Sequence, residues 1–177
     1  LCLVLFTAAI LTPIGRIETS IDYKSVFDFT GDGKLMLVDT HTKERLSVVY
    51  KDENGKYDDS VLYAIGHTLR CHGEDDVHPI SLKLIELVDH LQDHFDAKEV
   101  HVISGYRSPE YNAMLRKRSQ KVAHRSLHMR GLAMDIRIDG VSTKKLGRYA
   151  KSLKAGGVGV YPNSAFVHVD VGAIRNW

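Results

Sequence analysis

Residues 165–171, Ala-Phe-Val-His-Val-Asp-Val, alternate strictly between small or branched apolar side chains and side chains of other kinds. Because successive side chains of a β-strand point to opposite faces, we expect the alanine and the valines to face a core. Phe166, His168 and Asp170 then share the other face. The segment therefore predicts a strand that carries a histidine and an aspartate side by side, away from the core.

Residues 133–138 alternate in the same way. The methionine and the isoleucines face one side, and Asp135 and Arg137 face the other. We expect a second strand here, with the Asp135 carboxylate pointing away from the core.

The rest of the chain mixes helix and strand signals without a repeating order. Apolar residues recur at helical spacing after Ser81, which occupies a capping position, and Ser108-Pro109-Glu110 is a typical helix start. The expected helices are 60–70, 81–95, 108–119 and one that begins at Ser142; further strands are expected in 35–50, 100–103 and 157–161. This order predicts an α+β fold with a mainly antiparallel sheet packed against helices.

The chain of 177 residues is long enough for one domain with a core of its own. Its 24 basic and 22 acidic residues give a formal net charge of +2, which provides no argument for a nucleic-acid partner. Residues 1–12 are almost wholly apolar and are typical of a secretory signal, although a buried terminal helix or strand has the same composition. We expect residues 1–19 to be a signal peptide or a membrane-proximal segment of an exported protein. Residues 20–177 then form a single domain, with an N-terminal hairpin extension over 20–77 and a catalytic core over 78–177.

His128 precedes Asp135 by seven residues, and Gly131 lets the chain turn between the loop and the strand. Taken alone, this pair is more often a satisfied polar contact than a metal site. Together with His168, however, the residues offer two imidazole nitrogens and one carboxylate oxygen. With a water molecule they would make a four-coordinate catalytic zinc site, and this donor set favours Zn²⁺ over magnesium or calcium.

An arginine lies at a junction between a strand and a helix, in residues 104–109 (SGYRSP). The guanidinium of Arg107 is able to hold a carboxylate or to stabilise charge on a carbonyl oxygen. A surface arginine in a polar loop is the alternative.

Residues 100–177 resemble the D-alanyl-D-alanine metallopeptidases, and weaker similarity extends back through 35–70. The stretches that carry the resemblance are SGYRSPEYNAMLRKRS, VAHRSLHMRGLAMDI, AGGVGVYPNSAFVHVDVG and the closing RNW. The resemblance implies the compact fold shared with lysostaphin-type peptidases and the Hedgehog signalling domain. It also implies that His128, Asp135 and His168 bind zinc and that Arg107 polarises the scissile carbonyl. From the same motifs, Tyr106 and Ser126 are candidate substrate-binding residues.

The sequence departs from these relatives at one position. Several of them carry an acidic general base three residues before the last zinc histidine, where this chain has Ala165. Asp170 shares a strand face with His168, so it is our candidate for the base. The alternatives for Asp170 are that it orients His168 or that its role is purely structural.

These observations predict a monomeric zinc peptidase of the periplasm or cell envelope that acts on peptidoglycan stem peptides. An endopeptidase that cuts crosslinked stem peptides is the first hypothesis. A D,D-carboxypeptidase or dipeptidase acting on D-Ala-containing peptides is an alternative within the enzyme class. A non-catalytic, zinc-containing, Hedgehog-like module that binds the cell wall is the alternative from another class.

Overall fold

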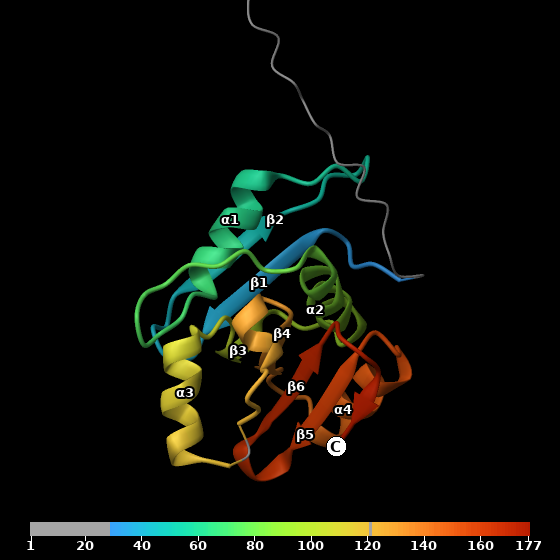
Figure 1. The fold of residues 1–177 in the computed structure, drawn as a ribbon. Coiled ribbons are helices and arrows are strands. Elements are labelled where there is room, and N and C mark those ends of the chain that lie inside the picture. The colour runs from blue at the N-terminus through green and yellow to red at the C-terminus, as the bar shows by residue number, and fades with distance from the viewer. Residues whose placement is uncertain (1–28, 121) are drawn as a thin grey trace, which may run out of the picture.

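The computed structural model describes residues 29–120 and 122–177. The signal segment predicted for residues 1–19 lies outside these ranges. Within them, one seven-stranded sheet runs through the molecule in the order β2-β1-β3-β4-β6-β5-β7, accompanied by four α-helices (Figure 1). The elements are β1 (Lys34–Asp39), β2 (Arg45–Val49), α1 (Asp59–Thr68), α2 (Leu82–His94), β3 (Val100–Ser104), α3 (Pro109–Arg118), the 3₁₀ turn η1 (Leu127–Arg130), β4 (Ala133–Arg137), α4 (Thr143–Ser152), β5 (Gly157–Tyr161), the 3₁₀ turn η2 (Pro162–Ser164), β6 (Phe166–Asp170) and β7 (Arg175–Asn176).

The sheet is mixed. Strands β1 and β2, β3 and β4, β4 and β6, and β5 and β6 pair antiparallel, whereas β1 with β3 and β5 with β7 pair parallel. The predicted α+β class is confirmed, and antiparallel pairs predominate. No helix in the described ranges is both long and apolar enough to cross a membrane.

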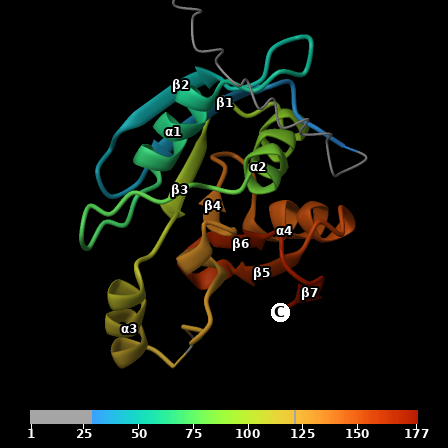
Figure 2. The same cartoon turned by 45° about the horizontal axis from the view of Figure 1, so that its top comes forward.

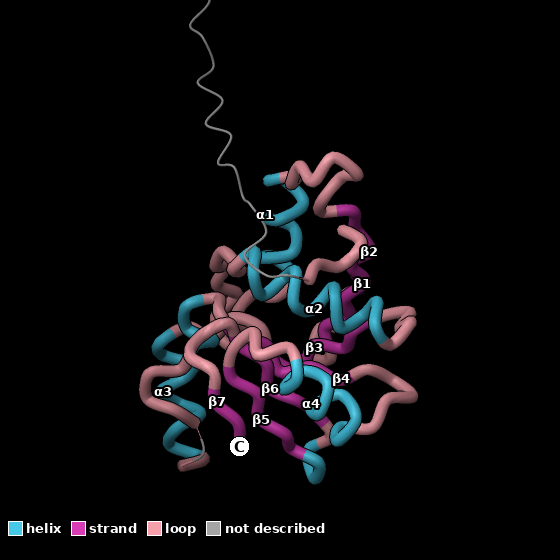
Figure 3. Tube along the Cα trace, turned by 90° about the vertical axis from the view of Figure 1, so that its right-hand side faces the viewer, coloured by secondary structure: helices cyan, strands magenta, loops and turns pink. Residues whose placement is uncertain are grey.

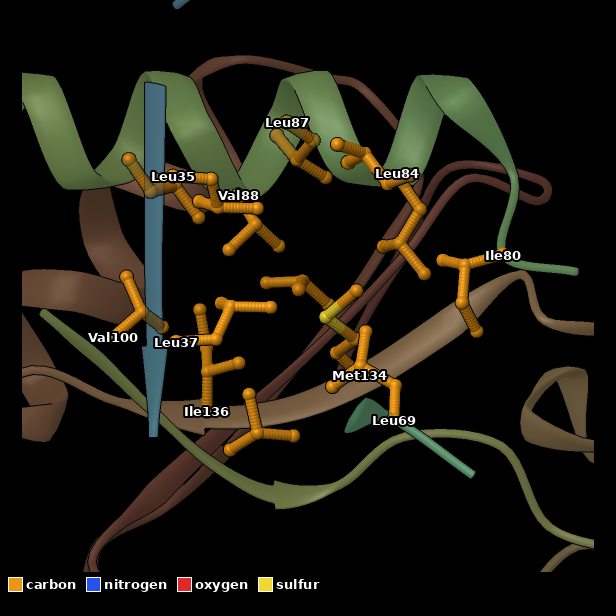
Figure 4. Close-up of a cluster of buried hydrophobic side chains, with 14 of the residues drawn as sticks. Leu35, Leu37, Leu69, Ile80, Leu84, Leu87, Val88, Val100, Met134 and Ile136 are labelled. Carbon is orange, nitrogen blue, oxygen red and sulfur yellow. The ribbon is translucent and has the colours of Figure 1, made fainter. Parts of the chain in front are cut away.

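Helices α2 and α4 cover one face of the sheet, and α3 lies on the other side of β4, β6 and β5 (Figures 2 and 3). The apolar stripe of α2 packs onto the residues of β1, β3 and β4 that point toward it, as predicted from the helical spacing. Figure 4 shows this core, in which Leu84, Leu87 and Val88 of the helix face Leu35, Val100, Met134 and Ile136 of the strands. Because the core occupies this face, side chains of opposite parity on β4 and β6 point away from it, toward the side of α3.

Serine side chains cap two of the predicted helices. Ser108 Oγ accepts a hydrogen bond from Tyr111 N at 3.0 Å, and Ser142 Oγ accepts one from Lys145 N at 3.3 Å. Ser81 also precedes its helix, but its side chain accepts no capping bond. For α2, the predicted capping position is therefore confirmed, but the expected side-chain hydrogen bond is absent.

Strand β6 begins one residue later than the alternating pattern predicts. Ala165 has a φ of +52°, so it ends the turn η2 in the left-handed region instead of starting the strand. Val167 and Val169 are fully buried on the core face, as expected. Asp170, on the other face, is also fully buried, so that face is covered and is not simply solvent-exposed.

Candidate metal centre

Three secondary-structure elements bring the predicted ligands together. Strands β4 and β6 are antiparallel neighbours, and their register places Asp135 directly opposite His168. His128 lies in η1, the turn that leads into β4. Gly131 ends this turn with a φ of +62°, and a Cβ there would lie 2.2 Å from Pro79 O. Only glycine fits both the conformation and the space, so Gly131 fixes the approach of His128 to the strand pair.

The donor atoms of these residues form a small triangle. His128 Nε2 lies 3.2 Å from His168 Nδ1 and 3.3 Å from Asp135 Oδ1, and His168 Nδ1 lies 2.9 Å from Asp135 Oδ1. Zinc bonds of about 2.0–2.1 Å at tetrahedral angles separate neighbouring ligand atoms by about 3.3 Å. The triangle therefore has the dimensions of one face of a tetrahedral zinc site.

The outer nitrogens of both imidazoles are occupied by acceptors. His128 Nδ1 donates to the carbonyl oxygen of Gly105 at 2.7 Å, and His168 Nε2 donates to Asp170 Oδ2 at 3.1 Å. Since these oxygens accept and do not donate, each neutral ring keeps its hydrogen on the outer nitrogen and turns a lone pair inward. Two lone pairs and the Asp135 carboxylate then converge at about 3 Å, and a bound cation would satisfy all three.

The electrostatics of the cluster also favour a cation. Burial lowers the pKa of His128 despite the nearby Asp135. Burial alone would raise the pKa of Asp135, but the charges and hydrogen bonds of His128, His168 and Arg107 hold it well below its usual range. Burial would lower the pKa of His168, yet its hydrogen bonds to Asp135 and Asp170 outweigh this and raise it. The carboxylate thus stays ionised at neutral pH, and the site attracts positive charge.

Arg107 follows β3 and reaches the ligand cluster. Its Nη2 donates to Asp135 Oδ2 at 2.5 Å and its Nε donates to Ser104 Oγ at 2.8 Å. The guanidinium therefore holds the oxygen of Asp135 that does not belong to the triangle. Its side chain is 13% exposed, so it remains accessible to a ligand at the edge of the site.

Asp170 lies beneath His168 and its carboxylate is saturated. Oδ1 accepts from Gly157 N and Gly172 N, both at 2.9 Å, while Oδ2 accepts from His168 Nε2 at 3.1 Å and Arg175 Nη2 at 2.7 Å. Burial alone would raise the pKa of Asp170, but the hydrogen bonds from His168, Gly157 and Gly172 lower it. The side chain is 0% exposed. Its contacts suit a group that orients the His168 ring.

The triangle forms part of the wall of a cavity of about 300 Å³. Among the described residues that line this cavity, Asp135 has the only side-chain carboxylate, and Arg107 lines it as well. Ser126 also lines it, although its Oγ accepts from His128 N at 3.3 Å and caps η1. Ala165 lies elsewhere, in the lining of a separate cavity of about 270 Å³.

Like Asp170, Tyr106 is a predicted site residue that does not line the cavity. It is 6% exposed, its ring stacks on that of His78 at 4.5 Å, and its hydroxyl donates to Asp76 Oδ2 at 3.3 Å. Its contacts therefore hold the 76–78 segment in place, away from the ligand cluster.

Comparisons with known proteins identify the family of this chain. The family model Peptidase_M15_2, described as peptidoglycan L,D-endopeptidase MepK, matches residues 30–177. This chain belongs to that family. The peptidoglycan L,D-endopeptidase MepK of Escherichia coli strain K12 is 38% identical over 144 residues, which cover 81% of this chain and 79% of the relative. The probable peptidoglycan L,D-endopeptidase MepK of Haemophilus influenzae is 38% identical over 139 residues, which cover 77% of this chain and 74% of the relative. No solved structure gave a significant match.

In this Peptidase_M15_2 chain, the described residues contain one other group of possible metal ligands, Asp32, Asp89 and Asp93. It offers only carboxylate oxygens, a donor set that suits magnesium or calcium better than zinc. Burial, followed by the charges of Asp93 and Asp32, raises the pKa of Asp89 to about 6, although bonds from Tyr50 and Gly33 oppose this. The group lies outside the cavity described above.

Three other residues of this family member line the cavity without having been predicted as site residues: Tyr161, Arg175 and Trp177. The closing RNW was noted only as part of the resemblance. A signal was present in β5, where Gly157 and Gly159 alternate with valines and so leave one face of the strand without side chains. Trp177 covers the open face at Gly159, and the sequence does not show this because it depends on the pairing of β5 with β7.

Proposed function

We propose that this chain is a zinc-dependent endopeptidase that hydrolyses peptide bonds in peptidoglycan. The observation that carries the proposal is the convergence of His128 Nε2, His168 Nδ1 and Asp135 Oδ1, within 3.3 Å of one another, on the wall of a cavity. Family membership supports it, because the relatives are peptidoglycan L,D-endopeptidases by name.

The three triangle residues would hold the ion. Zinc bound there supplies a Lewis acid that polarises a carbonyl oxygen and activates water. Arg107 would stabilise negative charge on the carbonyl oxygen of the scissile bond, since one edge of its guanidinium is fixed by Asp135 and Ser104. Ser126 would contribute mainly by shaping η1 around His128.

Asp170 would orient His168 and not serve as the general base. Both of its oxygens already accept two hydrogen bonds, and its side chain does not reach the cavity lining. A general base needs a free lone pair within reach of the proton that it removes. The orienting role needs only the bond from His168 Nε2, which keeps the Nδ1 lone pair turned toward the metal.

The proposed substrate places the protein in the periplasm or cell envelope, in agreement with the apolar residues 1–12 as an export signal. We further propose that the fold is of the Hedgehog and D-alanyl-D-alanine peptidase type. The single sheet that joins β1 and β2 to β3 supports one domain from the hairpin to the catalytic core.

The test is to incubate the zinc-loaded protein with muropeptides of defined crosslinks and to identify the products by mass. An endopeptidase releases the two halves of a crosslinked pair, whereas a D,D-carboxypeptidase releases terminal D-alanine. His168→Ala is the matched inactive control, because it removes one corner of the triangle and leaves Arg107 in place. A protein that binds the muropeptides but leaves every bond intact would be a binding module, and the proposal would fail.

A further inference from the structure

Strand β5 presents an unusual face beside the candidate metal centre. In its register with β6, Gly159 lies opposite His168 and Tyr161 lies opposite Phe166. These residues share the face that carries His168. Because Gly157 and Gly159 have no side chains, this face is open at two positions and ends in the phenol ring of Tyr161.

Trp177 fills the space above Gly159. A Cβ at Gly159 would lie 2.6 Å from Trp177 Nε1, so the indole occupies the position that any larger residue would need. The backbone fixes the residue there, since Val160 N donates to Trp177 O at 3.1 Å and Trp177 N donates to Val158 O at 3.2 Å. The indole consequently lies 5.3 Å from the ring of His168, centre to centre.

Arg175 holds the indole from the other side. Its guanidinium carbon lies 5.2 Å from the centre of the Trp177 ring, and its Nη2 donates to Asp170 Oδ2 at 2.7 Å. A guanidinium over an aromatic face is attracted to it. The indole of Trp177 therefore contacts the ring of His168 and the guanidinium of Arg175, which itself binds Asp170. The tryptophan is nevertheless 48% exposed to solvent.

The hydrogen bond between Trp177 and Tyr161 has a fixed direction. Trp177 Nε1 lies 2.6 Å from Tyr161 Oη, and an indole nitrogen donates but never accepts. Tyr161 Oη is the acceptor, so its own hydrogen is directed elsewhere. Within residues 29–120 and 122–177, that hydroxyl has no other hydrogen-bond partner, and Tyr161 lines the cavity. The bond leaves a positioned donor at the cavity wall.

We propose that the Tyr161 hydroxyl binds substrate by donating a hydrogen bond to an acceptor oxygen of a stem peptide in the cavity. Trp177 is the positioning residue that fixes this hydroxyl. This subsite rests on the proposed function for the identity of its ligand, and it adds a binding group on the side of His168 opposite Arg107. Tyr161 acts on affinity, whereas the metal ligands and Arg107 act on the chemical step.

The test uses the chain's single tryptophan, Trp177, as its own probe. Zinc-loaded protein is titrated with an uncrosslinked stem tetrapeptide, which lacks the crosslink bond, while indole emission is recorded. A saturable change in emission is expected for the wild type. Tyr161→Phe removes the hydrogen bond to the ligand and also the acceptor of Trp177 Nε1. The loss of the ligand bond should raise the Kd about 3- to 10-fold with zinc content unchanged. Tyr63→Phe is the matched control, because Tyr63 is 68% exposed on α1, outside the cavity lining, and its loss should leave the Kd as it is.

Titration calorimetry extends the test to Trp177→Phe, which keeps a ring but loses the indole N–H. Since Trp177 acts through Tyr161, the double variant should bind no more weakly than Tyr161→Phe alone. Additive losses would reject the positioning role. An unchanged Kd in Tyr161→Phe, or no binding by the wild type, would overturn the subsite. Binding as expected without cleavage of crosslinked muropeptides would instead count against the endopeptidase and leave the subsite standing.

Discussion

Replacing Asp170 by asparagine separates an orienting residue from a general base, and the structure indicates how the substitution acts. Asparagine keeps one oxygen and exchanges the other for an NH₂ group. Two backbone donors, Gly157 N and Gly172 N, converge on Oδ1 at 2.9 Å, so the retained oxygen should stay there. The NH₂ group then faces His168 Nε2 and Arg175 Nη2, both of which are donors to Oδ2 in the wild type.

The clash of donors has a specific consequence for His168. Its Nε2 can relieve the conflict only by giving up its hydrogen and accepting from the amide. The neutral ring then carries its hydrogen on Nδ1, the atom that lies 2.9 Å from Asp135 Oδ1 and belongs to the metal triangle. Zinc binding must reverse this tautomer against the amide, which should weaken the affinity by about 10- to 100-fold, the usual effect of losing such a partner.

The assay is a competition titration of zinc against a chelator, followed by turnover of muropeptides at increasing zinc. We expect Asp170→Asn to bind zinc more weakly and to regain most of its activity when zinc is in excess. Asp139→Asn is the control, because the Asp139 side chain is 74% exposed and pairs with Arg137 outside the cavity lining. Normal zinc affinity with turnover reduced by about 10²–10⁴ would refute the orienting role and identify Asp170 as the base. Normal affinity together with normal turnover would reject both roles.

Three further outcomes are expected. We expect metal analysis to find about one zinc ion per chain, and His168→Ala should lose most of it, because three ligands cannot spare one. Arg107→Lys should keep zinc but lose about 100-fold or more in turnover, since a lysine cannot reproduce the planar guanidinium; unchanged turnover would make Arg107 a bystander. Asp89→Asn should stabilise the fold at neutral pH. Burial raises the pKa of Asp89 to about 6 in the fold, so the stability that its protonated form contributes is present below pH 4 and lost as the pH rises through 6. The shift corresponds to at most about 3 kcal/mol, and thermal unfolding at pH 4 and pH 8 should show a smaller pH dependence in the variant.

The local elements of the fold were predictable because their signals lie within short stretches of sequence. Alternation in residues 133–138 and 165–171 identified β4 and β6 and assigned their faces, and both core faces are buried. The start of β6 was wrong by one residue because alternation does not report φ. Ala165 fits the alternating pattern, yet it takes a left-handed conformation to end the turn after Pro162.

The candidate ligand set was accessible from sequence for a related reason. The alternation of side chains along each strand placed Asp135 and His168 on the face away from the core. The β4–β6 register then brought them opposite each other. Strand alternation could not predict where the side chain of Tyr106 lies. That residue follows β3 directly, but its position is decided by a backbone bond to Leu69 O and by stacking on His78, both distant in sequence.

The role of Asp170 shows what spacing alone leaves open. A strand position two residues from His168 is compatible with a base, an orienting group or a structural residue. The choice depends on how many donors surround the carboxylate, and three of the four come from Gly157, Gly172 and Arg175. Gly157 is especially informative, since a Cβ there would lie 2.4 Å from Asp170 Oδ2. The absence of a side chain on β5 is thus what lets Asp170 approach the strand and receive its N–H. The same absence at Gly159 admits the indole of Trp177. One alternating Gly-Val-Gly-Val segment therefore shapes both the support of a candidate metal ligand and the wall of the cavity, and this becomes visible only once β5 is paired with β6 and β7.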